Sequence, residues 1–279
     1  MAASLIDTGT PDLLAALDQG VLTLTMNRPE ARNAMSRAMN QALQDQLATA
    51  EFNPAVKCIV LTGAGKGFCA GGDVKGMAAA GDVSKVGTVA ALTLDEGIAR
   101  QRSNQRATAG KLFKMANPTI AALPGAAAGA GLALALACDL RLMASTAIMT
   151  TAFARVGYSG DYGGSYFLTQ LVGSAKAREL YFLSDRVAAD EALRLGLTNW
   201  VCAPDELAAK TAEIAARLAS GPTVAYRYMK ENLNRAMAGE VDDCLDLEAT
   251  HHVHCGLTED HREATTAFVE KREPVFNGR

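Results

Sequence analysis

The chain has 279 residues, with 27 lysines and arginines against 30 aspartates and glutamates, and 49% of its residues are hydrophobic. Only 20% are charged, so the composition excludes a disordered protein and allows a large buried core. The net charge of −3 shows no basic bias of the kind that nucleic acid or an anionic membrane attracts, and we expect neither as a partner.

The first half of the sequence alternates short apolar runs with helical patterns, which is typical of an α/β fold. Residues 22–26 alternate in polarity and predict a strand, and residues 36–48 have helical spacing. Residues 58–62 and 119–123 are apolar, β-rich runs that predict buried strands. Residues 95–115 predict one long helix between these two strands.

Two glycine- and alanine-rich segments interrupt this pattern. Residues 77–92 have no clear period, and they could form either a lid over a site or a variable surface loop. Residues 124–131 predict a turn that leads into a buried helix. Two further strands are expected near residues 140–143 and 148–151.

Beyond Ser174 the pattern is almost wholly helical, and Trp200 is expected in the core. The predicted helices cover residues 175–183, 188–195, 206–218, 224–237, a stretch that begins near 241, and 259–271. Gly221-Pro222 separates two of them and predicts a boundary between a core, residues 1–220, and a helical subdomain, residues 221–279. This subdomain is too short to bury its own core well, so we expect it to pack on its neighbour or on another subunit.

The longest apolar stretch, residues 118–138, does not predict a membrane helix, because prolines and glycines interrupt it and its alanines are weakly hydrophobic. The N-terminus lacks the basic and apolar regions of a secretory signal, so a cytoplasmic location is expected. The six cysteines form no C-x-x-C pair, and free buried thiols are the simplest interpretation.

Two glycine-rich turns, AGGD at residues 70–73 and GAAAGAG at residues 125–131, follow predicted strands. Small residues let backbone N–H groups approach a ligand, and a helix that begins there adds a positive field. Two such N–H groups converging on one oxygen would form an oxyanion hole, although close helix packing explains the glycines equally well. Neither turn has the spacing of a dinucleotide-binding or Walker A motif.

Six blocks of sequence carry a more specific pattern when their order and spacing are taken together. They are LTLTMNRPEARNAMS, CIVLTGAGKGFCAGGDVKGM, NPTIAALPGAAAGAGLALALACDLRL, ARVGYSGDYGGSYFLTQLVG, LSDRVAADEALRLGLTNWV and AFVEKREPVF. From about Gly20 to Phe276 the chain resembles the crotonase, or enoyl-CoA hydratase/isomerase, superfamily. The resemblance implies a spiral of ββα units, followed by helices that assemble a homotrimer or a hexamer. It also implies an acyl-CoA substrate and no separate cofactor, because coenzyme A is part of the substrate.

The resemblance implies that the backbone N–H groups of Gly72 and Ala130 form the oxyanion hole, with Ala70 contacting substrate beside the first turn. Family members that hydrate 2-enoyl-CoA esters use two glutamates to activate water. The matching positions here are Ala133 and Phe153, and neither side chain can transfer a proton. The two-glutamate hydratase mechanism is therefore not expected for this chain.

Four basic residues match positions at which the family binds coenzyme A. Arg28, Arg32 and Lys66 lie where the family lines the CoA entrance, and Lys271 resembles a residue that reaches the CoA phosphates. Cationic side chains suit that role, since coenzyme A carries several phosphate charges. Each of the four is equally consistent with a solvated surface residue.

Asp161, in the segment GYSGDYGG, offers a substitute for the missing glutamates. The segment is similar to the ring-epoxide phenylacetyl-CoA isomerases. An apolar pocket formed by Phe153, Tyr158 and Tyr162 would raise the pKa of this carboxyl group and suit it to shuttle a proton. The alternative is that Asp161 simply caps the helix expected at residues 164–171.

The favoured function is isomerisation of an enoyl-CoA through a thioester enolate, with Asp161 as acid and base. The alternatives are a hydratase that uses Asp161 and water, and an acyl-CoA-binding protein without activity. A dehalogenase with a nucleophilic Asp161 would also need a base, and the four histidines all lie in the helical tail. The spacing of His251, His252 and His254 does not favour a metal site, and a surface or subunit-contact role is expected for them.

Overall fold

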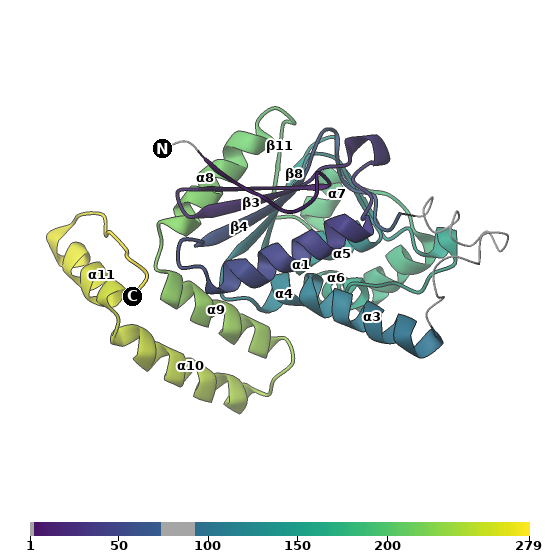
Figure 1. Ribbon diagram of the computed structural model, residues 1–279. Coiled ribbons are helices and arrows are strands. Elements are labelled where there is room, and N and C mark those ends of the chain that lie inside the picture. The colour runs from purple at the N-terminus through teal and green to yellow at the C-terminus, as the bar shows by residue number, and fades with distance from the viewer. Residues whose placement is uncertain (1–2, 74–92) are drawn as a thin grey trace.

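The computed structural model describes residues 3–73 and 93–279, whose strands form two sheets with helices packed around them (Figure 1). The larger sheet has seven strands, in the spatial order β1 (Ser4–Ile6), β2 (Leu13–Asp18), β3 (Val21–Met26), β4 (Cys58–Gly63), β6 (Thr119–Leu123), β8 (Leu140–Ala144) and β11 (Trp200–Cys202). The smaller sheet has four, in the order β10 (Val187–Ala188), β9 (Ile148–Thr150), β7 (Ala126–Ala128) and β5 (Gly67–Cys69).

The helices of the core pack on both sheets, and the remaining helices follow at the C-terminal end of the chain (Figure 1). They are α1 (Arg37–Phe52), α3 (Leu94–Ala107), α4 (Ala109–Lys114), α5 (Ala130–Ala137), α6 (Gly164–Leu183), α7 (Ala189–Arg194), α8 (Leu207–Ala219), α9 (Thr223–Ala236), α10 (Val241–Gly256) and α11 (Glu259–Glu270). Two 3-10 turns, η1 (Pro29–Ala31) and η3 (Ala154–Val156), lie in the loops.

The chain builds the two sheets by a repeated ββα step, which confirms the expected α/β class. A strand of the larger sheet is followed by a short strand of the smaller one and then by a helix, as in β6–β7–α5 and β8–β9–α6. Neighbouring strands from β3 to β11 run parallel. The side chains of β4 and β6 are buried on both faces of the sheet, as their continuous apolar runs predicted.

Several predicted elements differ from the structure. The helix expected over residues 95–115 is broken at Thr108, whose hydroxyl donates to the carbonyl oxygen of Asn104 and whose backbone leaves helical geometry. The turn expected at residues 124–131 contains β7, an all-alanine strand that exists because β5 and β9 pair with it. The two helices expected on either side of Gly173 form α6, which is kinked at that glycine.

The region after Ser174, expected to be almost wholly helical, also contains two short strands that were not predicted, β10 and β11. Trp200 lies on β11 with 37% of its surface exposed, so the expectation that it is a core residue is wrong. The six cysteines are all free, but only Cys58, Cys69 and Cys138 are fully buried. The lid or loop expected at residues 77–92 lies outside the described residues.

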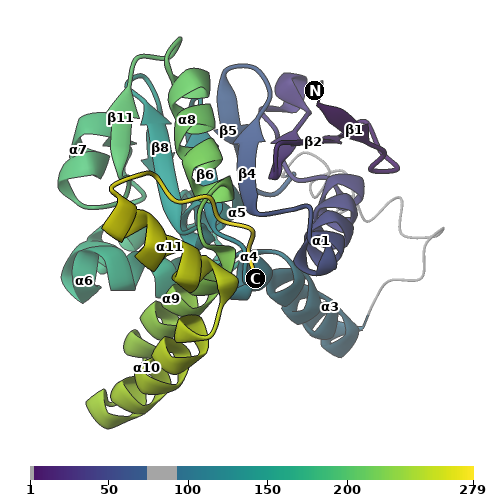
Figure 2. The ribbon, with the colours of Figure 1, turned by 90° about the vertical axis from the view of Figure 1, so that its left-hand side faces the viewer.

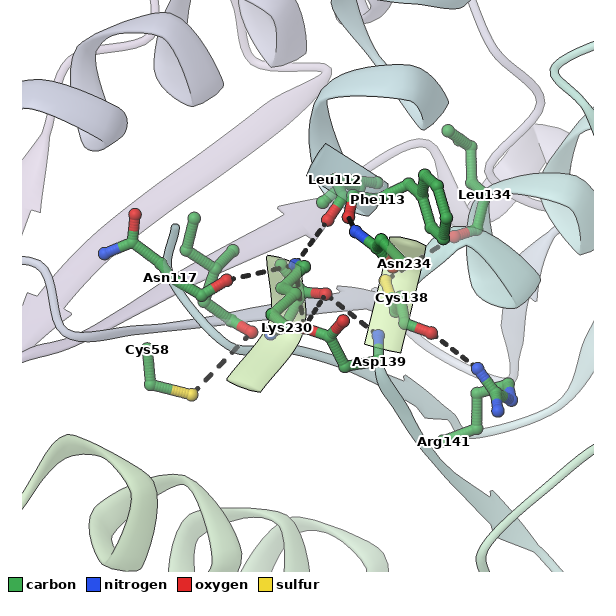
Figure 3. A network of polar contacts seen from close by, with 12 residues as sticks. Cys58, Leu112, Phe113, Asn117, Leu134, Cys138, Asp139, Arg141, Lys230 and Asn234 are labelled. Atoms are coloured by element: carbon green, nitrogen blue, oxygen red, sulfur yellow. Dashed lines mark hydrogen bonds and ion pairs between the residues drawn. The ribbon is translucent and has the colours of Figure 1, made fainter. Parts of the chain in front are cut away.

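Helix α9 is anchored to the core by one buried lysine. Lys230, with 8% of its surface exposed, donates to the carbonyl oxygens of Leu112 and Asn117 and pairs with the carboxylate of Asp139 at 2.8 Å (Figure 3). Asp139 also accepts hydrogen bonds from the backbone and hydroxyl of Thr119. The network thus joins α9 to α4, β6 and the start of β8.

Beyond α9, helix α10 projects away from the two sheets in Figure 2, and α11 stands apart from them in Figure 1. The boundary near Gly221 stays a prediction, although α9 is firmly attached to the preceding core. In the described part of the chain, no helix is both long enough and apolar enough to span a bilayer.

We expect Lys230→Met to lower the free energy of unfolding by about 3 kcal/mol, because Asp139 and two carbonyl oxygens would lose a buried cationic partner. Urea unfolding monitored by circular dichroism measures this change. The matched control is Lys210→Met, which removes an exposed pair with Glu213 and should cost less than about 1 kcal/mol. Equal losses in the two variants would contradict an anchoring role for Lys230.

Candidate active site

The two glycine-rich turns lie side by side because β5, which precedes the first, and β7, which lies within the second, are parallel neighbours. At the first turn, Gly71 has a φ of +91°, and a Cβ atom there would lie 2.8 Å from the carbonyl oxygen of Ala128. At the second, a Cβ on Gly131 would lie 2.4 Å from the carbonyl oxygen of Cys69. Only glycine therefore allows the two backbones to approach this closely.

Each turn places one residue on a shared cavity. Gly72 and Ala130 both line it, and within residues 3–73 and 93–279 neither N–H donates a hydrogen bond. Ala130 is the first residue of α5, so the partial positive charge of that helix end adds to its N–H. These two groups have the chemical character of an oxyanion hole.

The cavity has a volume of about 810 Å³, and Asp161 also lines it. Phe153 and Tyr162, which are 7% and 8% exposed, lie on its wall as expected. Tyr158 also lines it, with 60% of its surface exposed.

One carboxylate oxygen of Asp161, Oδ1, is buried and has no hydrogen-bond partner. Burial raises the pKa of this group from its ordinary value near 3.8 to about 6. The first turn of α6 is capped by Gly163, in a left-handed conformation, and by no side chain. The alternative interpretation of Asp161 as a helix cap is therefore wrong.

The sequence analysis did not identify Tyr181, whose buried hydroxyl also lacks a partner. A Cβ atom on Gly160 or Gly164 would lie 3.3 Å or 2.8 Å from this hydroxyl, so the two glycines around Asp161 make room for it. The Tyr181 ring stacks on Phe153 at a centroid distance of 5.9 Å. Tyr181 lies near the C-terminal end of α6, and no local sequence pattern links it to the GYSGDYGG segment.

Both positions that the resemblance matches to the hydratase glutamates, Ala133 and Phe153, carry apolar side chains. Phe153 lines the cavity, whereas Ala133 is 1% exposed on α5 and does not. The Cβ of Ala133 lies 3.2 Å from where a Cβ on Gly164 would be. No acid lies at either position, so Asp161 is the one carboxylate among the described residues that line the cavity.

The four cations expected to bind coenzyme A do not lie together in the structure. Arg32, Lys66 and Ala70 line a second cavity of about 410 Å³, which Arg155 and Arg186 also line. This cavity contacts the two turns through Ala70 and Ala128, whereas Gly72 and Ala130 line the first cavity. The sequence analysis missed Arg155 and Arg186 because nothing local connects them to the turns.

Arg28 and Lys271 lie elsewhere. The Arg28 guanidinium pairs with Asp73 at 3.1 Å and with Asp12 at 3.8 Å, so it fixes the loop before α1. Lys271 ends α11 and lines neither cavity.

Among residues 3–73 and 93–279, no three His, Cys, Asp or Glu side chains are grouped so that they could hold a metal ion. His251 is 6% exposed, stacks on Tyr228 and contacts the side chain of Asn232 at 2.6 Å. The surface or subunit-contact role expected for it is wrong, because it packs between α9 and α10. His252 and His254 are exposed.

Known proteins resemble this chain over nearly its whole length. The family model described as enoyl-CoA hydratase/isomerase matches residues 16–279. The 1,2-epoxyphenylacetyl-CoA isomerase of Escherichia coli (strain K12) is 35% identical, over 96% of this chain and 98% of that protein. The short-chain-enoyl-CoA hydratase of Clostridium acetobutylicum is 34% identical, over 91% and 92%. The crystal structure of an enoyl-CoA hydratase from Polaromonas sp. JS666 matches with a TM-score of 0.86 and 31% identity, over 95% of this chain and 99% of that one.

The burial of Asp161 can be tested without substrate. Between pH 4 and 6, Asp161 is largely protonated in the folded protein but ionised in the unfolded chain. The free energy of unfolding therefore falls as pH rises through this range. Above it Asp161 is ionised in both states, and its contribution no longer changes with pH. Asp161→Asn stays neutral. We expect this variant to gain stability over wild type as pH rises, by at most about 3 kcal/mol at pH 7. Urea unfolding of both proteins at pH 4 to 7 measures the difference, and a gap independent of pH would contradict a buried carboxylate.

Proposed function

The chain belongs to the enoyl-CoA hydratase/isomerase family, and we propose that within it this protein isomerises the double bond of an enoyl-CoA thioester, with Asp161 as acid and base. The family match and the similarity to solved hydratase structures confirm the crotonase-like fold. The observation that carries the proposal is the pairing of two backbone donors with a single buried carboxylate in one cavity.

In the proposed reaction the thioester oxygen of a 3-enoyl-CoA accepts hydrogen bonds from the N–H groups of Gly72 and Ala130. The Asp161 carboxylate removes a proton from C2, and the electron pair of that bond moves to give a dienolate whose charge rests on the oxygen. The protonated Asp161 returns the proton to C4, which leaves a 2-enoyl-CoA. One carboxylate is sufficient, because the proton leaves and returns on the same face.

The pKa of Asp161 suits both halves of this transfer. A carboxyl group with a pKa of about 6 is mostly ionised at neutral pH and can act as a base. Once protonated, it is a weaker acid than an exposed carboxyl group but is still able to protonate a dienolate carbon. The unpartnered Oδ1 is free to face the substrate.

Hydration is the alternative within the family, with Asp161 activating a water molecule. The similarity to both an isomerase and several hydratases does not separate the two reactions. What favours isomerisation is that Ala133 and Phe153 provide no second acid or base. A protein that binds acyl-CoA without turning it over is the remaining alternative.

The same proposal assigns the cationic cavity to coenzyme A. Arg32 and Lys66, together with Arg155 and Arg186, line it beside the two turns and can contact phosphate groups. Arg28 is already paired with carboxylates, so it would support this region indirectly. Lys271 lies on α11, and a role for it in CoA binding would require another subunit.

We also propose that the protein assembles as a homotrimer or a hexamer of two trimers. The C-terminal helices expose large apolar side chains, such as Leu233, Leu257 and Phe268, which are 69%, 76% and 84% exposed. A surface of this kind is typical of a subunit interface.

We expect wild-type protein in deuterated water to convert 3-enoyl-CoA into 2-enoyl-CoA, with deuterium entering at C4 whenever the proton on Asp161 exchanges. Asp161→Asn should lower the rate at least about 100-fold, because the amide cannot accept the proton. Mass spectrometry and NMR identify the product and the deuterium position. The rate constant kcat/KM should fall below pH 6 as Asp161 becomes protonated.

The binding of a saturated acyl-CoA to Asp161→Asn is the control for this experiment, since it should match wild type. Formation of 3-hydroxyacyl-CoA would favour the hydratase alternative. Binding without any turnover, by both proteins and across chain lengths, would favour the binding protein.

The Ala130 donor is testable because its position tolerates proline. Proline has no N–H and is well accommodated at the first residue of a helix, so Ala130→Pro should fold normally. We expect kcat to fall about 100- to 1,000-fold, as for the loss of one oxyanion donor. Leu94→Pro, at the first residue of α3 and 80% exposed, is the matched control and should keep full activity. An active Ala130→Pro enzyme would remove this N–H from the mechanism.

A further inference from the structure

The wall of the active-site cavity formed by α1 and α3 is unusually polar for a site that accepts an acyl chain. Apart from Gly97, every residue that these two helices place on the cavity has a polar side chain. These residues are Arg37, Asn40, Gln41 and Gln44 from α1, and Arg100, Gln101, Ser103, Asn104 and Gln105 from α3.

Both helices have apolar side chains but turn them elsewhere. Met39, Leu43 and Leu47 of α1 are almost fully buried in the core. Leu94 and Ile98 of α3 are exposed and do not line the cavity. The polarity of this wall is therefore a property of the helix faces that point inward, and not of the helices as a whole.

Four half-buried residues of this surface, Asn40, Gln44, Gln101 and Asn104, form what we call the polar wall. The side chains of Gln44 and Asn104 are hydrogen-bonded to each other at 3.2 Å across the two helices. The Oδ1 atom of Asn40 is buried and has no partner. A buried polar atom without a partner lowers the stability of the folded state by about 1–3 kcal/mol. An alkyl chain packed against this wall could not form the missing hydrogen bond.

The polar wall lies at the acyl end of the cavity. The cationic cavity contacts the two turns through Ala70 and Ala128, whereas Gly72 and Ala130 face the active-site cavity. A thioester held by the latter two residues, with its phosphates among the cations, directs its acyl group toward Asp161 and the polar wall.

From this arrangement we propose that the natural substrate carries a hydroxyl group on the distal part of its acyl group, and that the polar wall binds it. The inference rests on the proposed acyl-CoA function and adds the substrate class. The Oδ1 atom of Asn40 accepts a hydrogen bond from the hydroxyl group and the amide of Gln101 donates to the hydroxyl oxygen, so plain alkyl groups are poor ligands.

Three saturated thioesters of equal size test this proposal by isothermal titration calorimetry. In 5-methylhexanoyl-CoA the fifth carbon carries two methyl groups, in 5-hydroxyhexanoyl-CoA one methyl and one hydroxyl, and in 5-oxohexanoyl-CoA one methyl and one carbonyl oxygen. We expect 5-hydroxyhexanoyl-CoA to bind wild type about tenfold more tightly than 5-methylhexanoyl-CoA, which corresponds to about 1.4 kcal/mol. The carbonyl oxygen of 5-oxohexanoyl-CoA can only accept a hydrogen bond, so this ester should bind more weakly than the hydroxy ester, and equal or tighter binding would overturn the pairing with Asn40 Oδ1.

Gln101→Leu should reduce this preference at least about threefold, because one hydrogen bond to the substituent is lost. The matched control is Gln46→Leu, a residue of α1 that does not line the cavity and whose substitution should leave the preference unchanged. Equal or tighter binding of 5-methylhexanoyl-CoA by wild type overturns the inference and leaves the proposed function intact. Failure of all three thioesters to bind overturns the acyl-CoA function itself.

Discussion

The close approach of the two glycine-rich turns is the constraint on which the rest of the site depends. Side chains at Gly71, Gly125 or Gly131 would collide with backbone atoms of the facing segment at 2.0 to 2.8 Å. The short pairing of β5 with β7 holds the turns at this distance, and the ββα repeat of the core places those strands next to each other. Two backbone donors consequently reach one cavity with no side chain to direct them, and their geometry belongs to the fold rather than to any single residue.

Around those donors the structure retains polar atoms that folding alone would not favour. The buried Oδ1 atoms of Asn40 and Asp161 and the hydroxyl of Tyr181 have no partners in the described part of the chain. Each costs stability, and three such atoms near one cavity are typical of a site shaped by what it binds. The raised pKa of Asp161 has the same origin, because the apolar rings that line the cavity withhold water from its charged form.

The two cavities beside the turns are lined by different kinds of side chain. Exposed cations gather on the side that we assign to coenzyme A, where a highly charged ligand can be bound without burying protein charge. The other side combines aromatic residues near Asp161 with the amides of the polar wall. The C-terminal helices stand apart from both cavities, and Lys230 anchors the first of them to the core.

How much of this followed from the sequence depends on how local each feature is. Strand and helix positions such as residues 58–62 and 36–48 were predictable, because hydrophobic period is a property of neighbouring residues. The order of the motifs identified the family, the candidate donors and Asp161. Strand β7 was not predictable, since an alanine triplet becomes a strand only when β5 and β9 pair with it. Tyr181, Arg155, Arg186 and the polar wall were missed for the same reason. Their proximity to the turns is set by the packing of distant helices and loops, which only the tertiary structure decides.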